Sequence, residues 1–458
     1  MRAVPHPAMT ASILLRSDFL QRPHPLLARW CAFWVVAVAA SVPLGSATSN
    51  VLGGCLLVTL LAAGGYADHW RRWRAHPFAL ATLILFAVIF LGVSYSNAPF
   101  DEIRRSLTKY SRLLYAPIAI AFLTDEKWRR RALLAWIAAM LLTLALSYLH
   151  ALWAFPLARA TREHEQGDHY IFKHHITQNV MMSVFAVAAF AEAWRLRIAA
   201  LAAGNHAALT RRFWFWIAVA VAAAINVLFF VLGRAGYLTL LVNLIMVALV
   251  AFIAARDRRL MLVAASFVTV AALAAAESDS VQQRLHVAIS EVESSQERGI
   301  TTSIGQRLEY ASKSIDLIRE RPVLGWGTGS YAMEYCRIAK SPEWCKLGAY
   351  NPHNQFLFFA VQFGLLGLVA LVAWLITAGL AIRRLPLPEK MLGFALLATL
   401  VVHSLLDSPL YIVTEGTWYP LMLGILAAGA YERPTGPLQA DSNASARAST
   451  SSTDGHSG

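Results

Sequence analysis

Apolar residues gather along this chain in runs that are long enough to cross a lipid bilayer. A membrane helix needs roughly 17–25 consecutive, mostly apolar residues. The pattern predicts an all-α, polytopic membrane protein of about twelve transmembrane helices. The runs lie near residues 26–44, 50–66, 78–96, 107–123, 132–155, 176–194, 213–232, 235–255, 259–276, 354–382, 390–406 and 417–431.

Basic residues are divided unevenly between the loops and indicate how the chain is oriented. Each even-numbered run is followed by Arg or Lys, whereas the turns after the first and seventh runs carry almost no charge. Cytoplasmic loops of membrane proteins are enriched in Lys and Arg, so we expect both termini to be cytoplasmic. These basic residues are Arg71, Arg72, Arg74, Lys127, Arg129, Arg130, Arg131, Arg195, Arg197, Arg211, Arg212, Arg256, Arg258, Arg259, Arg383 and Arg384.

One large hydrophilic segment, at 277–353, lies on the opposite side of the membrane in this arrangement. It is too long for a simple connection and is therefore expected to be functional. Its pattern predicts amphipathic helices at 281–298 and 305–321, the second ended by Pro322. The expected division is a cytoplasmic segment at 1–25, spans one to nine at 26–276, the loop domain at 277–353, spans ten to twelve at 354–431 and a disordered tail, rich in Ser, Ala and Thr, at 432–458.

Composition agrees with a membrane protein and excludes one alternative. Hydrophobic residues make up 57% of the chain and charged residues 15%, against roughly 45–50% and 25% in soluble domains. The net charge of +13 would favour nucleic-acid binding in a soluble protein. Here the basic residues flank the ends of predicted spans, so membrane lipid is the expected surrounding and nucleic acid is not an expected partner.

Arginine on the outer side does not help topology and is therefore informative. Gly233 and Arg234 form the tight outer turn between two long apolar runs, and Arg307 lies in the loop domain. A guanidinium suits phosphate because its planar fork donates two parallel hydrogen bonds. Arg234 could instead be a helix-end residue reaching for water, and Arg307 taken alone could be an ordinary surface residue.

A second group of outer cations comprises Arg104, Arg105, Lys109 and Arg112. Lys109 and Arg112 are spaced to share a helix face. Together with Arg234 and Arg307, they favour an anionic substrate. The alternative is that the nearby acids at 101–102 neutralise part of this charge.

His353, in the sequence NPHNQF, joins the loop domain to the tenth span. A neutral imidazole accepts a proton at physiological pH, so His353 is a candidate general base. It could equally be a structural histidine bonded to Asn351 or Asn354. Asp407, which follows His403 by one turn, could orient such a base, pair with an arginine or form a helix-end ion pair.

Other apparent motifs do not carry an assignment. HEQGDH at 164–169 has the wrong spacing for a zincin helix, and GWGTGS at 325–330 lacks the βαβ unit of a dinucleotide site. No Asp-x-Asp pair is present to hold a divalent cation on a diphosphate, so no metal or other cofactor is expected. Cys336 and Cys345 lie close enough in the loop domain to form a disulfide if that domain is in an oxidising compartment.

Three segments resemble the O-antigen ligase/polymerase family of membrane glycosyltransferases. They are GRAGY at 233–237, GQRLEYASKSIDLIRERPVLGWGTGSY at 305–331 and NPHNQFLFFAVQFGLLGL at 351–368. The span count and the large loop before the tenth span are most similar to the ligase branch. The resemblance implies a bacterial inner-membrane enzyme with a periplasmic active site and no metal.

The resemblance also implies the reaction and the residues that perform it. Such a ligase transfers a glycan from undecaprenyl diphosphate to the lipid A–core oligosaccharide, in lipopolysaccharide biosynthesis. Carried over by position, Arg234 and Arg307 would stabilise the diphosphate leaving group and His353 would be the base. Asp407 resembles the family's late acid and is expected to bind substrate. Tyr310 and the cations Arg104, Arg105, Lys109 and Arg112 are also expected to bind substrate, the cations from their position alone and not from the resemblance. A single displacement would invert the anomeric centre.

Two other functions remain open at this point. An O-antigen polymerase or a protein O-oligosaccharyltransferase would use the same donor with a different acceptor. A transporter of polyanions or lipid-linked glycans would use the outer cations as a gate. The predicted spans are nearly free of charge at mid-depth, which disfavours transport.

Overall fold

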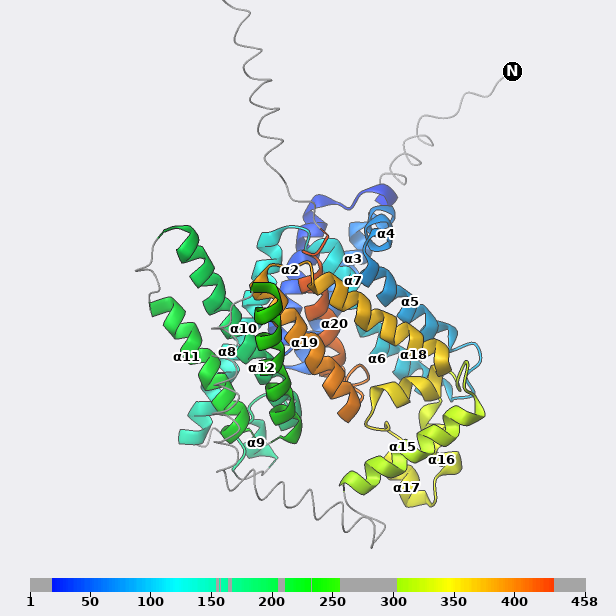
Figure 1. Cartoon of the computed structure of the whole chain (residues 1–458). Helices are drawn as coiled ribbons and strands as arrows, with labels where there is room; N and C mark the ends of the chain where they lie inside the picture. Colours follow the sequence, from blue (N-terminus) through cyan, green and yellow to red (C-terminus); the bar gives the residue numbers. More distant parts are fainter. Residues whose placement is uncertain are drawn as a thin grey trace, which may run out of the picture.

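Helices form the regular structure of the described part of this chain (Figure 1). The computed structural model describes residues 19–153, 156, 158–163, 167–204, 211–231, 233–255 and 303–431. Within these ranges the elements are α2 (Pro25–Ser41), α3 (Ser46–Ala63), α4 (Tyr66–Ala75), α5 (Pro77–Leu91), α6 (Phe100–Tyr110), η1 (Ser111–Leu114), α7 (Tyr115–Phe122), α8 (Glu126–Leu152), α9 (Arg159–Arg162), α10 (His175–Ala202), α11 (Arg211–Ile225), η3 (Asn226–Phe230), α12 (Arg234–Ala255), α15 (Ser303–Glu320), α16 (Tyr331–Ile338), α17 (Pro342–Gly348), α18 (Gln355–Ile382), α19 (Leu387–Leu406) and α20 (Val413–Ala427).

The chain is a multi-pass membrane protein. Six described helices are long and apolar enough to span a bilayer, namely α3, α8, α11 with η3, α12, α18 and α19. There is a seventh span if α4 and α5, between which the chain bends by 105°, are counted together as one broken span. The expected span at 259–276, the expected helix at 281–298 and both expected terminal segments up to residue 18 and from residue 432 lie outside the described residues. The predicted number of about twelve is therefore not reached by this count.

The expected span at 107–123 is not one continuous helix. The chain passes from amphipathic α6 through the 3-10 turn η1 into the short α7. Pro117 has no amide hydrogen, so it cannot donate to the carbonyl of Leu113 four residues earlier. This missing hydrogen bond accounts for the interrupted helix, and it leaves the basic helix α6 as a separate element.

The helices pack around a buried C-terminal element. All residues of α20 from Glu415 to Ala427 are buried, and the helix contacts α7, α8, α18 and α19. On one side α10 packs against α11, α12 and α19, and on another α18 packs against α5. Figure 1 shows α15, α16 and α17 together at one end of this bundle, beside the start of α18.

The helix predicted at 305–321 is confirmed as α15, and the chain turns away after Glu320, next to Pro322. Its buried face carries Tyr310 and Ser314, whereas the Leu308 side is open, with Leu308 62% exposed. The disulfide expected from the sequence is present: Cys336 of α16 is bonded to Cys345, nine positions later, in α17.

Helix α18 is broken at Gly364, where φ is 57° and ψ is −151°. The GWGTGS segment is a turn, as the sequence indicates, and it bonds to the backbone released by this break. Trp326 N donates to Val361 O at 2.9 Å and Gly327 N to Gln362 O at 2.7 Å. In return, Leu365 N donates to the carbonyl of residue 322 at 2.8 Å. The backbone polar groups at the break are thus satisfied by the loop, as a membrane protein requires.

Candidate active site

His353 and Asp407 form a hydrogen-bonded pair where the loop domain meets the helical bundle. The distance from His353 Nδ1 to Asp407 Oδ1 is 3.2 Å, although the two residues are 54 positions apart. A carboxylate only accepts hydrogen bonds, so Nδ1 carries the hydrogen and the lone pair of the ring lies on Nε2. The His353 side chain is 38% exposed and that of Asp407 19%. An accessible imidazole oriented by a more buried carboxylate is the arrangement of a general base.

The backbone at His353 is held in a conformation that residues other than glycine rarely adopt. Its φ is +50°, in the left-handed region. The amide of His353 donates to Asn351 Oδ1 at 2.7 Å, and Asn354 caps the start of α18 by accepting from Phe356 N and Leu357 N, each at 3.0 Å. Thus Asn351 and Asn354 hold the backbone, while the imidazole itself bonds to Asp407.

Asp407 is held at the end of α19 and is favoured in its ionised form. Its Oδ1 also accepts from Ser408 N at 2.7 Å. Burial raises the pKa of Asp407, but the hydrogen bond and charge of His353, assisted by His403 and the Ser408 amide, more than offset this, and the net pKa is lowered from 3.8. A carboxylate that stays ionised stabilises the imidazolium that forms when His353 accepts a proton.

Tyr310 connects helix α15 to this pair. Its ring is 2% exposed and stacks on His353, with the ring centroids 6.0 Å apart and the planes 26° from parallel. Arg307 precedes Tyr310 by three positions in α15 and is exposed. Residues three apart lie on neighbouring parts of a helix surface, so Arg307 lies one turn from the ring that packs on His353.

Arg234 is the first residue of α12, and the backbone before it is held by a buried asparagine. Asn179 of α10 donates from Nδ2 to Val231 O at 2.8 Å and to Gly233 O at 3.4 Å. Gly236 packs so closely on Asn179 that an added Cβ would lie 2.3 Å from its Cγ. Residues 234–237 of GRAGY thus form the first turn of α12, with no room for a side chain at Gly236. The described contacts do not join Arg307 directly to the His353–Asp407 pair.

The cations of α6 and η1 lie in three different environments, and that of Lys109 is described after those of the three arginines. Arg104 and Arg105 form ion pairs with Asp101 at 3.5 Å and Glu102 at 2.6 Å, as the sequence allowed. Arg112 Nη2 reaches Asn50 Oδ1 at 3.5 Å.

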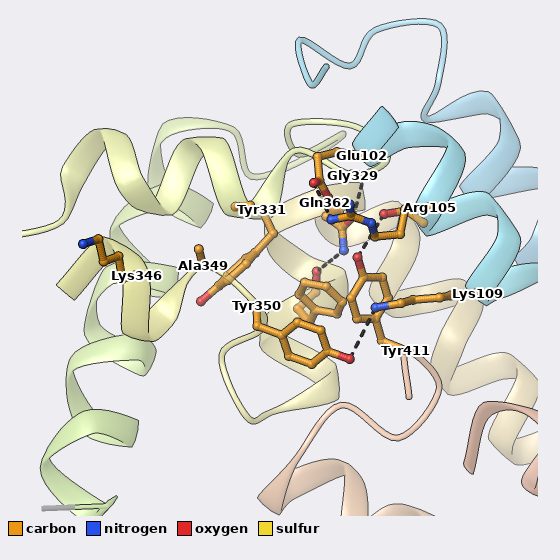
Figure 2. Close-up of a pocket in the computed structure, with 13 residues that line it drawn as sticks. Glu102, Arg105, Lys109, Gly329, Tyr331, Lys346, Ala349, Tyr350, Gln362 and Tyr411 are labelled. Atoms are coloured by element: carbon orange, nitrogen blue, oxygen red, sulfur yellow. Dashed lines mark hydrogen bonds and ion pairs between the residues drawn. The ribbon is translucent and has the colours of Figure 1, made fainter. Parts of the chain in front are cut away.

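Lys109 has an environment of a different kind, and together with Arg105 it lines a cavity of about 290 Å³ (Figure 2). Its ammonium group lies over the rings of Tyr411 and Tyr350, 3.6 and 4.6 Å from their centroids. Lys109 is thus held by aromatic rings. Arg104 and Arg112 are not among the residues that line the cavity.

Comparison with known families agrees with this geometry. Residues 218–372 match a family model described as O-Antigen ligase. This segment of the chain is therefore similar to the O-antigen ligase family. A search of curated proteins finds no match.

The O-antigen ligase segment contains Arg234, Arg307 and His353, whereas Asp407 and Lys109 lie outside it. Sequence reasoning missed Asn179, the buried amide that holds the backbone before Arg234. It named Asn351 as a partner of the His353 ring, whereas Asn351 accepts from the His353 amide. A polar residue at the start of an apolar run, as at Asn179, was the available signal. Their partners lie on other elements or in turns, which periodicity does not reveal.

Among the described residues, no three His, Cys, Asp or Glu side chains gather where they could hold a metal ion.

Proposed function

We propose that this protein is an O-antigen ligase of the bacterial inner membrane. It transfers a glycan from undecaprenyl diphosphate to a hydroxyl of the lipid A–core oligosaccharide, on the periplasmic side, with both termini cytoplasmic and residues 277–353 in the periplasm. The observation that supports this reaction most directly is the His353–Asp407 pair, at 3.2 Å, within a chain whose residues 218–372 match the O-antigen ligase family.

The proposed step is a single displacement at the anomeric carbon. His353 Nε2 takes the proton of the acceptor hydroxyl, and the acceptor oxygen forms a bond to the anomeric carbon. The bond from that carbon to the diphosphate oxygen breaks, and the electron pair leaves with undecaprenyl diphosphate. Attack from the face opposite the leaving group inverts the anomeric centre. Proton transfer to a positioned base contributes about 10²–10⁴-fold to such a rate.

Charge stabilisation in this proposal is the task of the two arginines. The leaving diphosphate gains negative charge in the transition state, and preorganised donors at such a position are worth more in a partly dehydrated site than in water. Arg234 and Arg307 each offer a planar fork that matches phosphate oxygens. In this proposal they take the role that a divalent metal has in many other glycosyltransferases.

The lipopolysaccharide of a strain lacking this gene tests the function. For a ligase, we expect loss of all long glycan on lipid A, accumulation of undecaprenyl-linked glycan and restoration by the parental gene but not by His353→Ala. Retention of a single repeat unit on lipid A would instead identify a polymerase. Normal lipopolysaccharide with loss of glycan from proteins would identify a protein O-oligosaccharyltransferase.

A further inference from the structure

A cavity lined by Lys109, Tyr350 and Tyr411 has no part in the step described above. Its volume is about 290 Å³, near the lower end of the roughly 300–1,000 Å³ typical of small-molecule sites. Arg105 and Lys109 of α6 line it together with Tyr331, Tyr350 and Tyr411 (Figure 2). Lys346 also lines it, but Figure 2 shows its ammonium group directed away from the other side chains. The cavity thus combines two cations with several aromatic rings.

Lys109 is the cation in this cavity that is best placed to receive an anion. It has no carboxylate within ion-pair distance among the described residues, while Glu102, the acid in the lining, is bound to Arg105. Its ammonium group is fixed by the Tyr411 and Tyr350 rings and donates to Tyr350 Oη at 3.3 Å. Burial, then the neighbouring charges of Arg105 and Arg112, lower the pKa of Lys109 to about 8. An anion in the cavity would relieve this repulsion.

Two short segments connect the cavity to the proposed base. Tyr350 precedes His353 by three positions, and Tyr411 follows Asp407 by four. Each segment therefore supplies one member of the His353–Asp407 pair and one ring of the cavity, and the two rings are 5.8 Å apart. Three residues span at most about 10 Å, so the cavity lies within reach of a substrate whose hydroxyl is at His353.

We propose that this cavity binds a phosphorylated sugar of the acceptor, close to the sugar whose hydroxyl receives the glycan. This inference rests on the proposed function, because it assumes a glycan acceptor at His353. The tyrosine rings offer flat apolar faces to a sugar, and Lys109 is a compact charge for phosphate. A phosphate has three strong acceptor oxygens, which the Lys109 ammonium, the remaining N–H groups of Arg105 and tyrosine hydroxyls can satisfy together.

The acceptor is a better source of this phosphate than the donor. The donor diphosphate is assigned to Arg234 and Arg307, and Arg307 is not among the residues that line the cavity. The cavity instead takes Tyr350 and Tyr411 from the two segments that carry His353 and Asp407, and His353 is the group proposed to contact the acceptor hydroxyl. Since a lysine with a pKa of about 8 is charged below that pH and neutral above it, the acceptor KM should rise as the pH increases beyond about 8.

The test is transfer by the purified full-length protein to two preparations of one acceptor. One is the lipid A–core oligosaccharide with its phosphate groups, and the other is the same material after phosphatase treatment. The parent should prefer the phosphorylated acceptor by roughly tenfold or more in kcat/KM, as expected for a charge-assisted contact. Lys109→Gln should reduce this preference to about twofold or less, and Lys109→Arg should restore it, because the positive charge returns.

Matched variants and the donor kinetics separate the alternatives. Arg319→Gln removes a charge that is 76% exposed and paired with Asp316 on α15, and it should keep the parental preference. Equal use of both acceptors by the parent, or a preference that survives in Lys109→Gln, would overturn the assignment. If the donor KM of Lys109→Gln were higher than that of the parent with both acceptors, the cavity would bind the donor diphosphate instead. A parent that uses neither acceptor would overturn the proposed function itself.

Discussion

At the scale of single residues, the clearest sign of function is the backbone at His353. A residue with a Cβ in the left-handed region costs about 1–2 kcal/mol relative to its preferred conformations. Asn351 holds this conformation through the His353 amide. With the backbone in this conformation, the imidazole bonds to Asp407.

Substitution of His353 separates base catalysis from a structural role. His353→Ala should abolish transfer, by at least about 10²-fold, while thermal stability and donor binding stay near parental. Transfer rates of the two purified proteins, with thermal unfolding and donor binding measured on the same samples, test this. An alanine variant with the parental rate would exclude His353 and direct attention to Asp407.

The forked shape of the arginines can be tested without removing their charge. Arg234→Lys and Arg307→Lys keep a positive charge but lose bidentate donation, so each should lower kcat/KM by about tenfold or more. Arg319→Lys, on an exposed part of α15, is the matched control and should be parental. If Arg234→Lys and Arg307→Lys both kept the parental kcat/KM, the proposal that these residues bind the diphosphate through a bidentate fork would be wrong.

Residue types and positions could be predicted from the sequence, but not their partners. The pattern identified His353 and Asp407 as chemical candidates and left three roles open for the acid. Only the fold shows that they bond to each other, because 54 positions separate them. The same holds for Lys109, whose two rings belong to Tyr350 and Tyr411, more than 200 positions away along the chain.

At the scale of elements, the outer end of α12 depends on close packing against α10. The GRAGY turn has Gly236 against Asn179, and Asn179 in turn bonds to the backbone that precedes Arg234. The position of the Arg234 backbone is therefore determined by a glycine and an asparagine that carry no charge.

Gly236→Ala should displace Asn179 and lower both stability and transfer. The added Cβ would lie 2.3 Å from Asn179 Cγ, and such overpacking costs about 1–3 kcal/mol. Gly54→Ala in α3, where no atom lies within 4 Å of the added Cβ, is the control and should be as stable as the parent or slightly more so. Thermal unfolding in detergent and transfer rates measure both. Parental behaviour of Gly236→Ala would show that the turn adapts.

The Cys336–Cys345 disulfide should stabilise the loop helices without taking part in chemistry. Closing a loop of this size contributes roughly 2–3 kcal/mol. Cys336→Ser should therefore lower the unfolding temperature, measured without reductant, while leaving kcat close to parental. Cys55→Ser removes a free cysteine and serves as the control. Peptide mapping that finds two free thiols in the parent would contradict the bridge.

Elements were predicted best where one periodic pattern decides them. Helix α15 was expected at 305–321 and is found at Ser303–Glu320. The interruption in 107–123 and the break in α18 were not foreseen, because apolar content continues through both. Membrane helices tolerate proline and glycine, so neither Pro117 nor Gly364 is by itself a reliable stop.

At the scale of the whole molecule, the membrane orientation decides where every candidate residue lies. The described helices include six that are long and apolar enough to span a bilayer. The basic loops predict that the outer cations, the loop helices and His353 share one side. Loop charges and span lengths predict this orientation. They do not predict the packing of α20 or the bend between α4 and α5.

Reporter fusions test the orientation directly. Alkaline phosphatase fused after residue 340 should be active, because that segment is expected in the periplasm, whereas a fusion after residue 384 should be inactive. Green fluorescent protein at the same two positions should give the opposite pattern. Cytoplasmic signals at residue 340 would contradict the proposed location of the site.

The break in α18 makes the 322–327 loop a clamp on both halves of the helix. The part before Gly364 begins beside His353 and the part after it continues through the bundle to Ile382. Backbone hydrogen bonds join the loop to residues 361 and 362 before the break and to residues 365 and 366 after it. A continuous helix is a stiff rod that transmits tilt along its length, and membrane helices tilt when bilayer thickness changes. With glycine as a joint and the loop bonded on both sides of it, we expect a tilt of the part after Gly364 to be shared with the loop, and not to pass undiminished along one stiff helix to His353.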